Sequence, residues 1–248
     1  MQYGICHLSI VPIRACAEET AEMVSQLLYG EHYKVLEQRK QWSKIRSAFD
    51  NCEGWIQNLQ LTFIEESAYT DLMEDACPAH TVDLVSYVEL DKNLLLPIVL
   101  GSVIHKKSNH VHEGNSIASS QQKSNLINTA LLYLNTPYLW GGKTPFGVDA
   151  SGFTQMVYRI NGYNLLRNAT EQASQGTALS FIEESETGDL AFFDNNEGII
   201  DHVGIIMENN YIIHVHGKVR IDRLDHTGIF NYDSKTYTHK LRVIKQII

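Results

Sequence analysis

Hydrophobic positions in the first part of the chain recur in short alternating runs. Three runs, "YGICHLSIVPIR", "HYKVLEQRKQWSKIRSA" and "CEGWIQNLQLTFI", mix apolar and polar residues at strand spacing and are separated by polar connections. This pattern predicts a small antiparallel β-barrel. Between the first two runs, "EETAEMVSQLLYGE" has apolar residues at helical spacing and reaches Gly30. We therefore expect one or two helical turns inserted into the barrel.

A second β-rich zone follows at "TVDLVSYVELDKNLLLPIVLGSVIHKK", with a predicted turn at Asp91-Lys92-Asn93 between its apolar runs. The next segment, "SNHVHEGNSIASSQQKS", is polar and favours an exposed linker at a domain boundary. Its His110 and His112 are interpreted as residues of a solvated loop rather than as a metal-binding tract.

From about Asn125 the periodicity changes to helix and then to strand. The segments "NLINTALLYLN" and "SGFTQMVYRING" have helical spacing, and the second stops at Gly162. The segments "GDLAFFD", "DHVGIIMEN", "YIIHVHG" and "LRVIKQII" follow with the character of consecutive strands. Helices followed by an antiparallel sheet predict an α+β domain.

Composition narrows the class of protein. The chain has 248 residues, of which 44% are hydrophobic, which is enough for two compact units. Its formal net charge of −9, without a Lys/Arg run, argues against a nucleic-acid partner. The sequence predicts neither a signal peptide nor a membrane span. The four cysteines lack the CxxC spacing that would indicate a zinc knuckle or a redox pair; they are Cys6, Cys16, Cys52 and Cys77.

The segment "YLWGGKTPFGVDASGFTQMVYRINGY" predicts a loop that leads into a helix, with Asp149-Ala150-Ser151-Gly152 at the junction. A helix N-terminus stabilises an anion and binds a developing oxyanion, so a nucleophile at position 150 would be activated there. A thiol would need an imidazole to take up its proton. His202 and His214 lie on successive predicted strands, where a base and an orienting group can come together. Residue 150, however, is alanine.

These segments, together with "GDLAFF", "DHVGIIM" and "IIHVHGKVRID", resemble the NlpC/P60 peptidoglycan peptidases. The N-terminal half resembles the bacterial SH3 domains that are fused to them. The resemblance implies an SH3-like β-barrel domain at 1–68, a second SH3-like segment with linker at 69–122, and a papain-like domain at 123–248. The last would be an NlpC/P60 domain of α+β class, with helices packed on an antiparallel sheet and a cleft facing the first domain.

The chain is similar in particular to cell-wall γ-D-glutamyl-L-diamino acid endopeptidases, also called dipeptidyl-peptidase VI. In that family the helix-junction motif is Asp-Cys-Ser-Gly, so Ala150 stands at the position of the catalytic cysteine. The resemblance implies that His202 is the general base and that His214 orients it. It also implies a peptide of the L-Ala-γ-D-Glu-L-diamino acid type as ligand, no cofactor, a monomer, and a location in the bacterial cytoplasm or periplasm.

The resemblance further assigns residues to substrate binding. It implies a tyrosine near the oxyanion at Tyr138, a cleft tryptophan at Trp140, and contacts to the peptide from Asp149 and Ser151. The full set of expected substrate-binding residues is Tyr138, Trp140, Asp149, Ser151, Asn168, Cys52 and Cys16.

Several positions depart from the family pattern. Asn168 replaces an aspartate, Cys52 a tyrosine and Cys16 an acidic residue, and these changes suggest a pocket no longer built for an ammonium group. His216 replaces a small residue. Cys16 and Cys52 are also candidates for a disulfide bond in an oxidising compartment.

Alanine cannot attack a carbonyl, and Ser151 cannot replace the cysteine because one residue along a helix turns a side chain by about 100°. The sequence leaves four interpretations open. The chain is a natural pseudoenzyme that still binds cell-wall fragments, an engineered Cys-to-Ala variant of an active peptidase, or a non-catalytic module that binds a protein through its SH3 barrel. The fourth is a zinc site of His202, His214 and His216, with a metal-bound water in place of the thiol.

Overall fold

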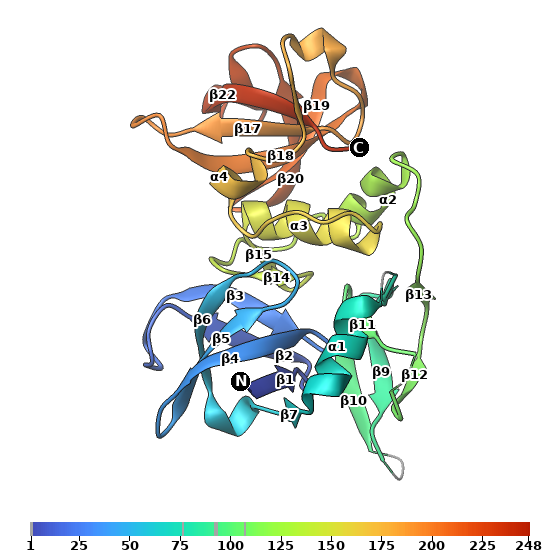
Figure 1. The fold of residues 1–248 in the computed structure, drawn as a ribbon. Coiled ribbons are helices and arrows are strands. Elements are labelled where there is room, and N and C mark those ends of the chain that lie inside the picture. The colour runs from blue at the N-terminus through green and yellow to red at the C-terminus, as the bar shows by residue number, and fades with distance from the viewer. Residues whose placement is uncertain (1, 76, 92–93, 107) are drawn as a thin grey trace. The chain divides into compact units, whose positions relative to one another are not determined.

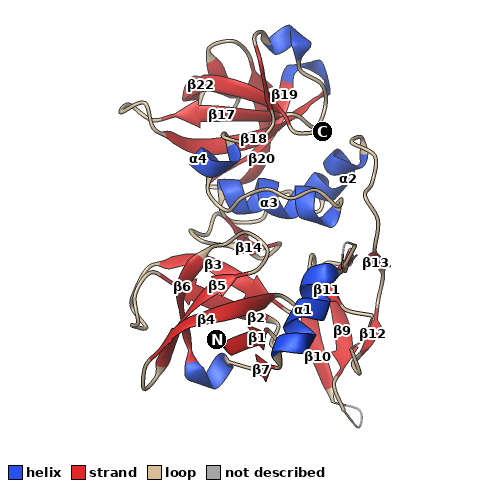
Figure 2. Cartoon of the chain, viewed as in Figure 1, coloured by secondary structure: helices blue, strands red, loops and turns tan. Residues whose placement is uncertain are grey.

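The computed structural model describes residues 2–248 with the exception of 76, 92–93 and 107. The chain divides into two compact units, each rich in β-strands (Figure 2). The first unit comprises Met1–Ser120 together with Trp140–Pro145, and the second comprises Gln121–Leu139 together with Phe146–Ile248.

The first unit contains an antiparallel sheet of seven strands. These are β1 (Gln2–Ile5), β2 (Ile10–Arg14), β3 (Met23–Leu28), β4 (His32–Gln38), β5 (Trp42–Ser47), β6 (Glu53–Gln57) and β7 (Phe63–Ile64). Their order is β3-β2-β6-β5-β4-β1-β7. Alternate residues point inward, so that Val11 and Ile13 of β2 meet Ile45 of β5 and Ile56 of β6 in one core. The predicted SH3-like barrel is confirmed.

The prediction of helical turns between the first two runs is wrong. Residues Met23–Leu28 form strand β3, which pairs antiparallel with β2. Both faces of this strand are covered: Leu27 packs in the core, and the buried Gln26 accepts a 2.8 Å hydrogen bond from the backbone N–H of Lys143. An apolar run of this length is compatible with both the helical and the strand period. Pairing with β2 makes it a strand.

The remainder of the first unit consists of one helix and short strands. Helix α1 (Glu66–Glu74) places the ring of Tyr69 4.4 Å from that of Tyr3. The strands are β8 (Ala79–Thr81), β9 (Val85–Glu89), β10 (Leu95–Val99), β11 (Val103–Ile104), β12 (Val111–Glu113), β13 (Ser116–Ile117) and β14 (Lys143–Thr144). Strands β10-β9-β12 form one sheet and β11-β8-β13 another. That this region is SH3-like stays a prediction, and Lys92 and Asn93 of the predicted turn lie outside the described residues.

The segment interpreted as a solvated linker is partly ordered as strands β12 and β13. Within it, His112 is hydrogen bonded to the hydroxyl of Ser86 at 3.0 Å, and His110 to the hydroxyl of Tyr29 at 2.6 Å. The loop interpretation holds for His110, which lies in a bend, and was wrong for His112, which lies on β12. Neither side chain is fully solvated, because each is partly buried and hydrogen bonded within the unit.

The second unit packs helices on a seven-stranded antiparallel sheet (Figure 1). Its helices are α2 (Asn125–Leu131), α3 (Ala150–Ile160) and α4 (Ala169–Gln172). Its strands are β15 (Gly147–Val148), β16 (Thr177–Leu179), β17 (Leu190–Asp194), β18 (Ile200–Met207), β19 (Tyr211–His216), β20 (Lys218–Leu224), β21 (Gly228–Asn231) and β22 (Thr236–Gln246). The sheet order is β16-β22-β17-β18-β19-β20-β21, and β22 also pairs with β21. This arrangement confirms the predicted α+β class.

Helix α3 is the element that the sheet positions most firmly. It packs against β18 and β19 and against α2. Its apolar side chains, among them Phe153 and Val157, are fully buried. The helix ends at Asn161 and is followed by Gly162 in the left-handed region at φ 86°, a conformation that favours glycine. Among the described residues, no helix is sufficiently long and apolar to span a bilayer.

Candidate active site

The N-terminus of helix α3 is held by the carboxylate of Asp149. This residue is the N-cap, and its Oδ1 accepts a 2.6 Å hydrogen bond from the backbone N–H of Gly152. The buried guanidinium of Arg167 donates to both carboxylate oxygens, from Nη2 to Oδ2 at 2.6 Å and from Nη1 to Oδ1 at 3.1 Å. This bidentate pair fixes the orientation of the carboxylate at the helix start.

Ala150 is the first residue of α3 and is only 8% exposed. Its methyl group offers neither a nucleophile nor a hydrogen-bonding group. The hydroxyl of Ser151 accepts from Arg167 Nη1 at 3.1 Å and lies 3.3 Å from Asp149 Oδ1. That hydroxyl belongs to the cap network, which agrees with the expectation that Ser151 does not replace a thiol. The sequence has no cysteine after Cys77, so the second unit contains no thiol.

A chain of three side chains crosses the neighbouring sheet. His202 of β18 lies with Nε2 3.0 Å from Nδ1 of His214 on β19, and His214 Nε2 lies 3.0 Å from Oδ2 of Asp222 on β20. Arg220 donates to both oxygens of Asp222, at 2.6 and 3.0 Å. The pairing predicted for His202 and His214 is present as a direct hydrogen bond. Asp222 and Arg220 were not anticipated from the sequence.

Strand register explains why the two histidines meet. Gly204 is paired with His214 across β18 and β19, and His202 precedes Gly204 by two residues on the same face. A side chain at position 204 would not fit, because a Cβ there would lie 2.8 Å from the Cβ of His214 and 2.8 Å from Cδ1 of Ile212. Glycine therefore allows the close approach of the two strands at this point.

The hydrogen-bond chain assigns the tautomers of both imidazoles. Asp222 is held as a carboxylate by Arg220, so it accepts, and His214 donates from Nε2–H. The Nδ1 of His214 is then the acceptor for Nε2–H of His202. His202 consequently keeps its lone pair on Nδ1, which is the form that can take a proton from a nucleophile.

The electrostatics keep the imidazoles neutral. Burial, and next the neighbouring His239, hold the pKa of His202 well below its ordinary value. Burial also lowers the pKa of His214, against the opposing effect of Asp222. For Asp222, burial alone would raise the pKa, but the hydrogen bonds from His214 and Arg220 outweigh it and lower the pKa to about 2. The group is thus a neutral base backed by an ionised acid.

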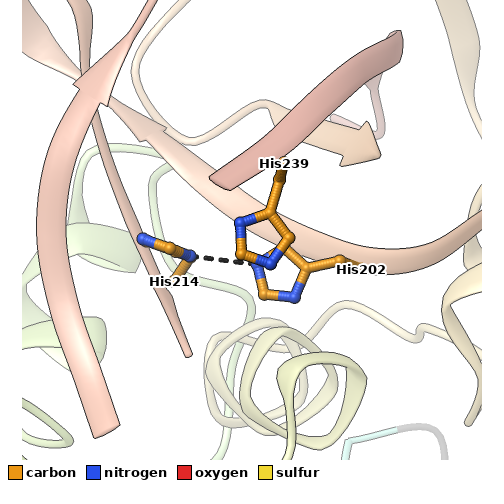
Figure 3. Close-up of side chains that lie close together, drawn as sticks. All are labelled: His202, His214 and His239. Atoms are coloured by element: carbon orange, nitrogen blue, oxygen red, sulfur yellow. Dashed lines mark hydrogen bonds between the residues drawn. The ribbon is translucent and has the colours of Figure 1, made fainter. Parts of the chain in front are cut away.

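A third imidazole joins this pair. His239 of β22 stacks on His202 with ring centroids 3.9 Å apart and an interplanar angle of 19°, and Figure 3 shows the rings of His202, His214 and His239 converging. Burial lowers the pKa of His239 to about 3. His239 was not predicted as a site residue, because the last strand was predicted only from "LRVIKQII" onward, whereas β22 begins at Thr236. The alternation of "TYTHKLRVI" was the available signal.

Comparison with known proteins identifies both parts of the chain. Residues 135–240 match the NlpC/P60 family, and residues 13–61 match the bacterial dipeptidyl-peptidase SH3 domain. The chain therefore contains an NlpC/P60 domain. The suspected relationship, with a bacterial SH3 domain ahead of an NlpC/P60 domain, is confirmed.

The relatives are similar over most of this chain. The γ-D-glutamyl-L-lysine dipeptidyl-peptidase of Bacillus subtilis is 28% identical over 211 residues, which is 77% of this chain and 71% of that protein. Dipeptidyl-peptidase 6 of Lysinibacillus sphaericus is 24% identical over 238 residues, which is 83% of this chain and 85% of that protein. The crystal structure of an NlpC/P60 family protein from Bacillus cereus has the same fold, with a TM-score of 0.81 at 17% identity and 99% of each chain covered.

Within the NlpC/P60 domain, Tyr138 lies beside the start of α3. It forms an isolated bridge with Val148, the residue before Asp149, and its side chain is 44% exposed. Burial, and next the charge of Asp149, raise the pKa of the Tyr138 phenol. Tyr138 is thus held as a neutral hydrogen-bond donor near the helix N-terminus. Its role at an oxyanion stays a prediction.

Asn168, where the resemblance implies an aspartate, is the N-cap of α4, and its backbone N–H donates to Glu171 Oε2 at 3.2 Å. Asparagine and aspartate serve about equally well at an N-cap, so this departure does not disturb the helix.

The other expected substrate-binding residues belong to the first unit. Trp140 is 58% exposed, Cys16 is exposed and Cys52 is partly buried. Cys16 and Cys52 are both free thiols, so the disulfide considered from the sequence is not formed. Their contribution to binding stays a prediction, as does that of Asp149 and Ser151.

Proposed function

We propose that this chain binds cell-wall peptides of the L-Ala-γ-D-Glu-L-diamino acid type and does not cleave them through a thiol. One observation carries the proposal. Ala150 stands at the N-terminus of α3, where a nucleophile would be activated, while the base, its orienting group and the cap network around that position are complete. The nucleophile is missing, and the hydrogen-bonded groups around its position remain in place.

Each of these groups can form an interaction with a bound peptide. The N-terminus of α3 presents partial positive charge that favours a ligand carbonyl or carboxylate. The Nδ1 lone pair of His202 can accept a hydrogen bond from a peptide N–H, and the neutral phenol of Tyr138 can donate one. The relatives named γ-D-glutamyl-L-lysine dipeptidyl-peptidase support the choice of ligand class.

The first experiment compares this chain with an Ala150→Cys variant on L-Ala-γ-D-Glu-L-Lys, followed by mass spectrometry. We expect no cleavage above background by the chain itself, in the presence of a chelator. For Ala150→Cys we expect cleavage at least about 1,000-fold above background, because a nucleophile acting with an oriented base contributes by far the most when both are present.

Two matched variants define the chemistry. Ala150→Cys combined with His202→Ala should lose the restored activity, since the thiol then lacks its base. Ala150→Ser should remain nearly inactive, because a hydroxyl is far less acidic than a thiol and burial lowers the pKa of His202, which makes it a weak base for that proton. Thiol-dependent cleavage that survives His202→Ala would contradict the assigned role of the base.

Binding is measured separately by calorimetry with the same peptide and the unchanged chain. We expect saturable binding of this peptide and weaker binding by the Asp149→Ala variant. A peptide that lacks the γ-D-glutamyl link should not bind in this way. Absence of binding, with Ala150→Cys also inert, would overturn the proposal and favour the interpretation in which the chain acts as a protein-interaction module.

A further inference from the structure

Three histidines of the second unit, His202, His214 and His239, form a cluster, and only His202 and His214 have a role in thiol chemistry. One ring nitrogen from each of His202, His214 and His239 lies within 4.8 Å of the others. The three rings come from strands β18, β19 and β22 and lie close together (Figure 3). Within the described parts of the chain, no other group of three histidine, cysteine or acidic side chains brings its ligand atoms together in this way.

Hydrogen bonds to neighbouring groups determine which ring nitrogen of His214 and of His239 carries the lone pair that can bind a metal ion. His214 gives its Nε2–H to the buried carboxylate of Asp222, which leaves a lone pair on Nδ1. His239 Nδ1 lies 2.9 Å from the hydroxyl of Thr238, which itself donates to the carbonyl of Ile229 at 3.4 Å. The hydroxyl therefore accepts from Nδ1–H, and Nε2 of His239 keeps its lone pair. A carboxylate or oxygen acceptor behind the imidazole is the usual outer arrangement of a metal-bound histidine.

We propose that His202, His214 and His239 bind one Zn²⁺ ion. Three neutral imidazoles are a ligand set suited to zinc, and the arrangement leaves a fourth position of a tetrahedron open. The site differs from the one considered from the sequence, because His239 takes the place of His216. The ring of His216 is exposed, and its centroid is 6.4 Å from that of His214.

Zinc binding requires small, definable movements. Zn–N bonds of about 2.0–2.1 Å in a tetrahedron place the nitrogens about 3.4 Å apart, so the 3.0 Å pair of His202 and His214 opens slightly and the wider pairs close. His239 must turn about χ2, because its ring is inclined by only 19° to that of His202 and two lone pairs cannot meet from stacked rings. The side chain of His239 is partly exposed and lies on the outer part of the cluster, which leaves room for that turn.

Metal binding also changes the protonation of His202. Its Nε2 now carries the proton shared with His214, and this proton must move to Nδ1 before Nε2 can coordinate. No proton is lost overall, since the neutral imidazole exchanges one tautomer for the other. His202 with hydrogen on Nδ1 cannot act as a base from that nitrogen. A zinc-loaded site and a thiol-activating site are therefore alternative states of the same histidines.

The test is zinc binding by the chain as it stands, with any histidine tag removed. After incubation with excess Zn²⁺ and gel filtration, elemental analysis should find about one zinc per chain. Zn²⁺ should also raise the unfolding temperature, because a ligand that binds only the folded state stabilises it. Substituted Co²⁺ should give the intense visible absorption of a four-coordinate nitrogen site.

His239→Phe is the decisive variant, because phenylalanine keeps a stacked ring on His202 and removes one ligand. We expect zinc affinity to fall about 100-fold or more, given that even loss of an outer partner costs 10–100-fold. His216→Phe is the matched control, an exposed histidine of the same cluster whose loss should change affinity less than about 3-fold. Thermal unfolding in chelator confirms that both variants are folded.

Two results of these zinc measurements would contradict the proposed site. Zinc bound equally by the unchanged chain and by His239→Phe would overturn the site, since exposed thiols such as Cys16 and Cys77 are common to both. A loss confined to His216→Phe would overturn the assignment of His239. Failure of the peptide-binding proposal leaves these measurements untouched, because none contains peptide.

Discussion

At the scale of single residues, alanine at position 150 alters the chemistry of the site without disturbing its backbone. The cap of α3 depends on Asp149, Gly152 and Arg167, and none of these contacts involves the side chain of residue 150. A thiol can therefore be restored there with little structural cost. The neighbouring positions are far less tolerant, and Gly204 is the clearest case.

Gly204→Ala should break the His202–His214 pair. The added Cβ would lie 2.8 Å from the Cβ of His214, so β19 must shift, at an expected cost of about 1–3 kcal/mol in the free energy of unfolding. The measurement is the slowly exchanging imidazole N–H signal in NMR, together with a denaturant titration. Gly198→Ala is the control for the imidazole signal, because a Cβ there meets open space; the φ of 76° strains an alanine, so this variant loses stability while keeping the signal. An intact imidazole signal in Gly204→Ala would contradict the packing argument.

The cysteines should differ sharply in reactivity. Burial raises the pKa of Cys6 to about 12, and its S–H donates to the carbonyl of Leu8. Only about one thiol in 10,000 is then ionised at pH 8, whereas the thiolate is the reactive form. We expect alkylation at pH 8 to modify the exposed Cys16 and Cys77 in the native chain, and Cys6 only after unfolding, as read by peptide mass spectrometry. Rapid native labelling of Cys6 would show that its site opens.

At the scale of elements, the site is made by one helix start and by the register of the strands behind it. Helix α3 begins where it does because Asp149 caps it, and β18, β19 and β20 present His202, His214 and Asp222 at matching positions. Substitutions at the cap should therefore affect both the stability of the unit and the geometry of the site.

Asp149→Ala should destabilise the second unit by at least about 2 kcal/mol, since it removes a cap worth about 1 kcal/mol and also the carboxylate that receives two hydrogen bonds from buried Arg167. Asp149→Asn keeps an acceptor for the Gly152 N–H and should cost less. Both are measured by urea unfolding followed with circular dichroism. Equal costs for the two variants would show that the charge, rather than the cap, is what matters.

At the scale of the whole molecule, the chain does not divide at a single point. Trp140–Pro145 belongs to the first unit, although the residues before and after it belong to the second. Within that short segment, buried Lys143 forms an ion pair with buried Glu31, with Nζ 3.0 Å from Oε1. A part of the sequence that lies inside the family match thus contributes a charged pair to the core of the other unit.

Lys143→Met should destabilise the first unit by about 3–5 kcal/mol, because it leaves the Glu31 carboxylate buried without its lysine partner. All three tryptophans, Trp42, Trp55 and Trp140, belong to the first unit, so their fluorescence follows its unfolding alone. The double variant with Glu31→Gln should recover part of the loss. A fluorescence transition unchanged by Lys143→Met would contradict a stabilising role for the pair.

The sequence by itself determined the α+β class, the barrel ahead of it, the helix that follows the Asp149–Gly152 junction and the pairing of His202 with His214. These features rest on short-range signals: strand and helix periods, a capping aspartate, and two histidines on successive strands. The tertiary structure decided the rest. It turned Met23–Leu28 into a strand through pairing with β2, and it joined Asp222 and His239 to the histidines from strands that the periodicity did not set apart. Contacts between distant strands depend on register across the sheet, and no local pattern encodes that register.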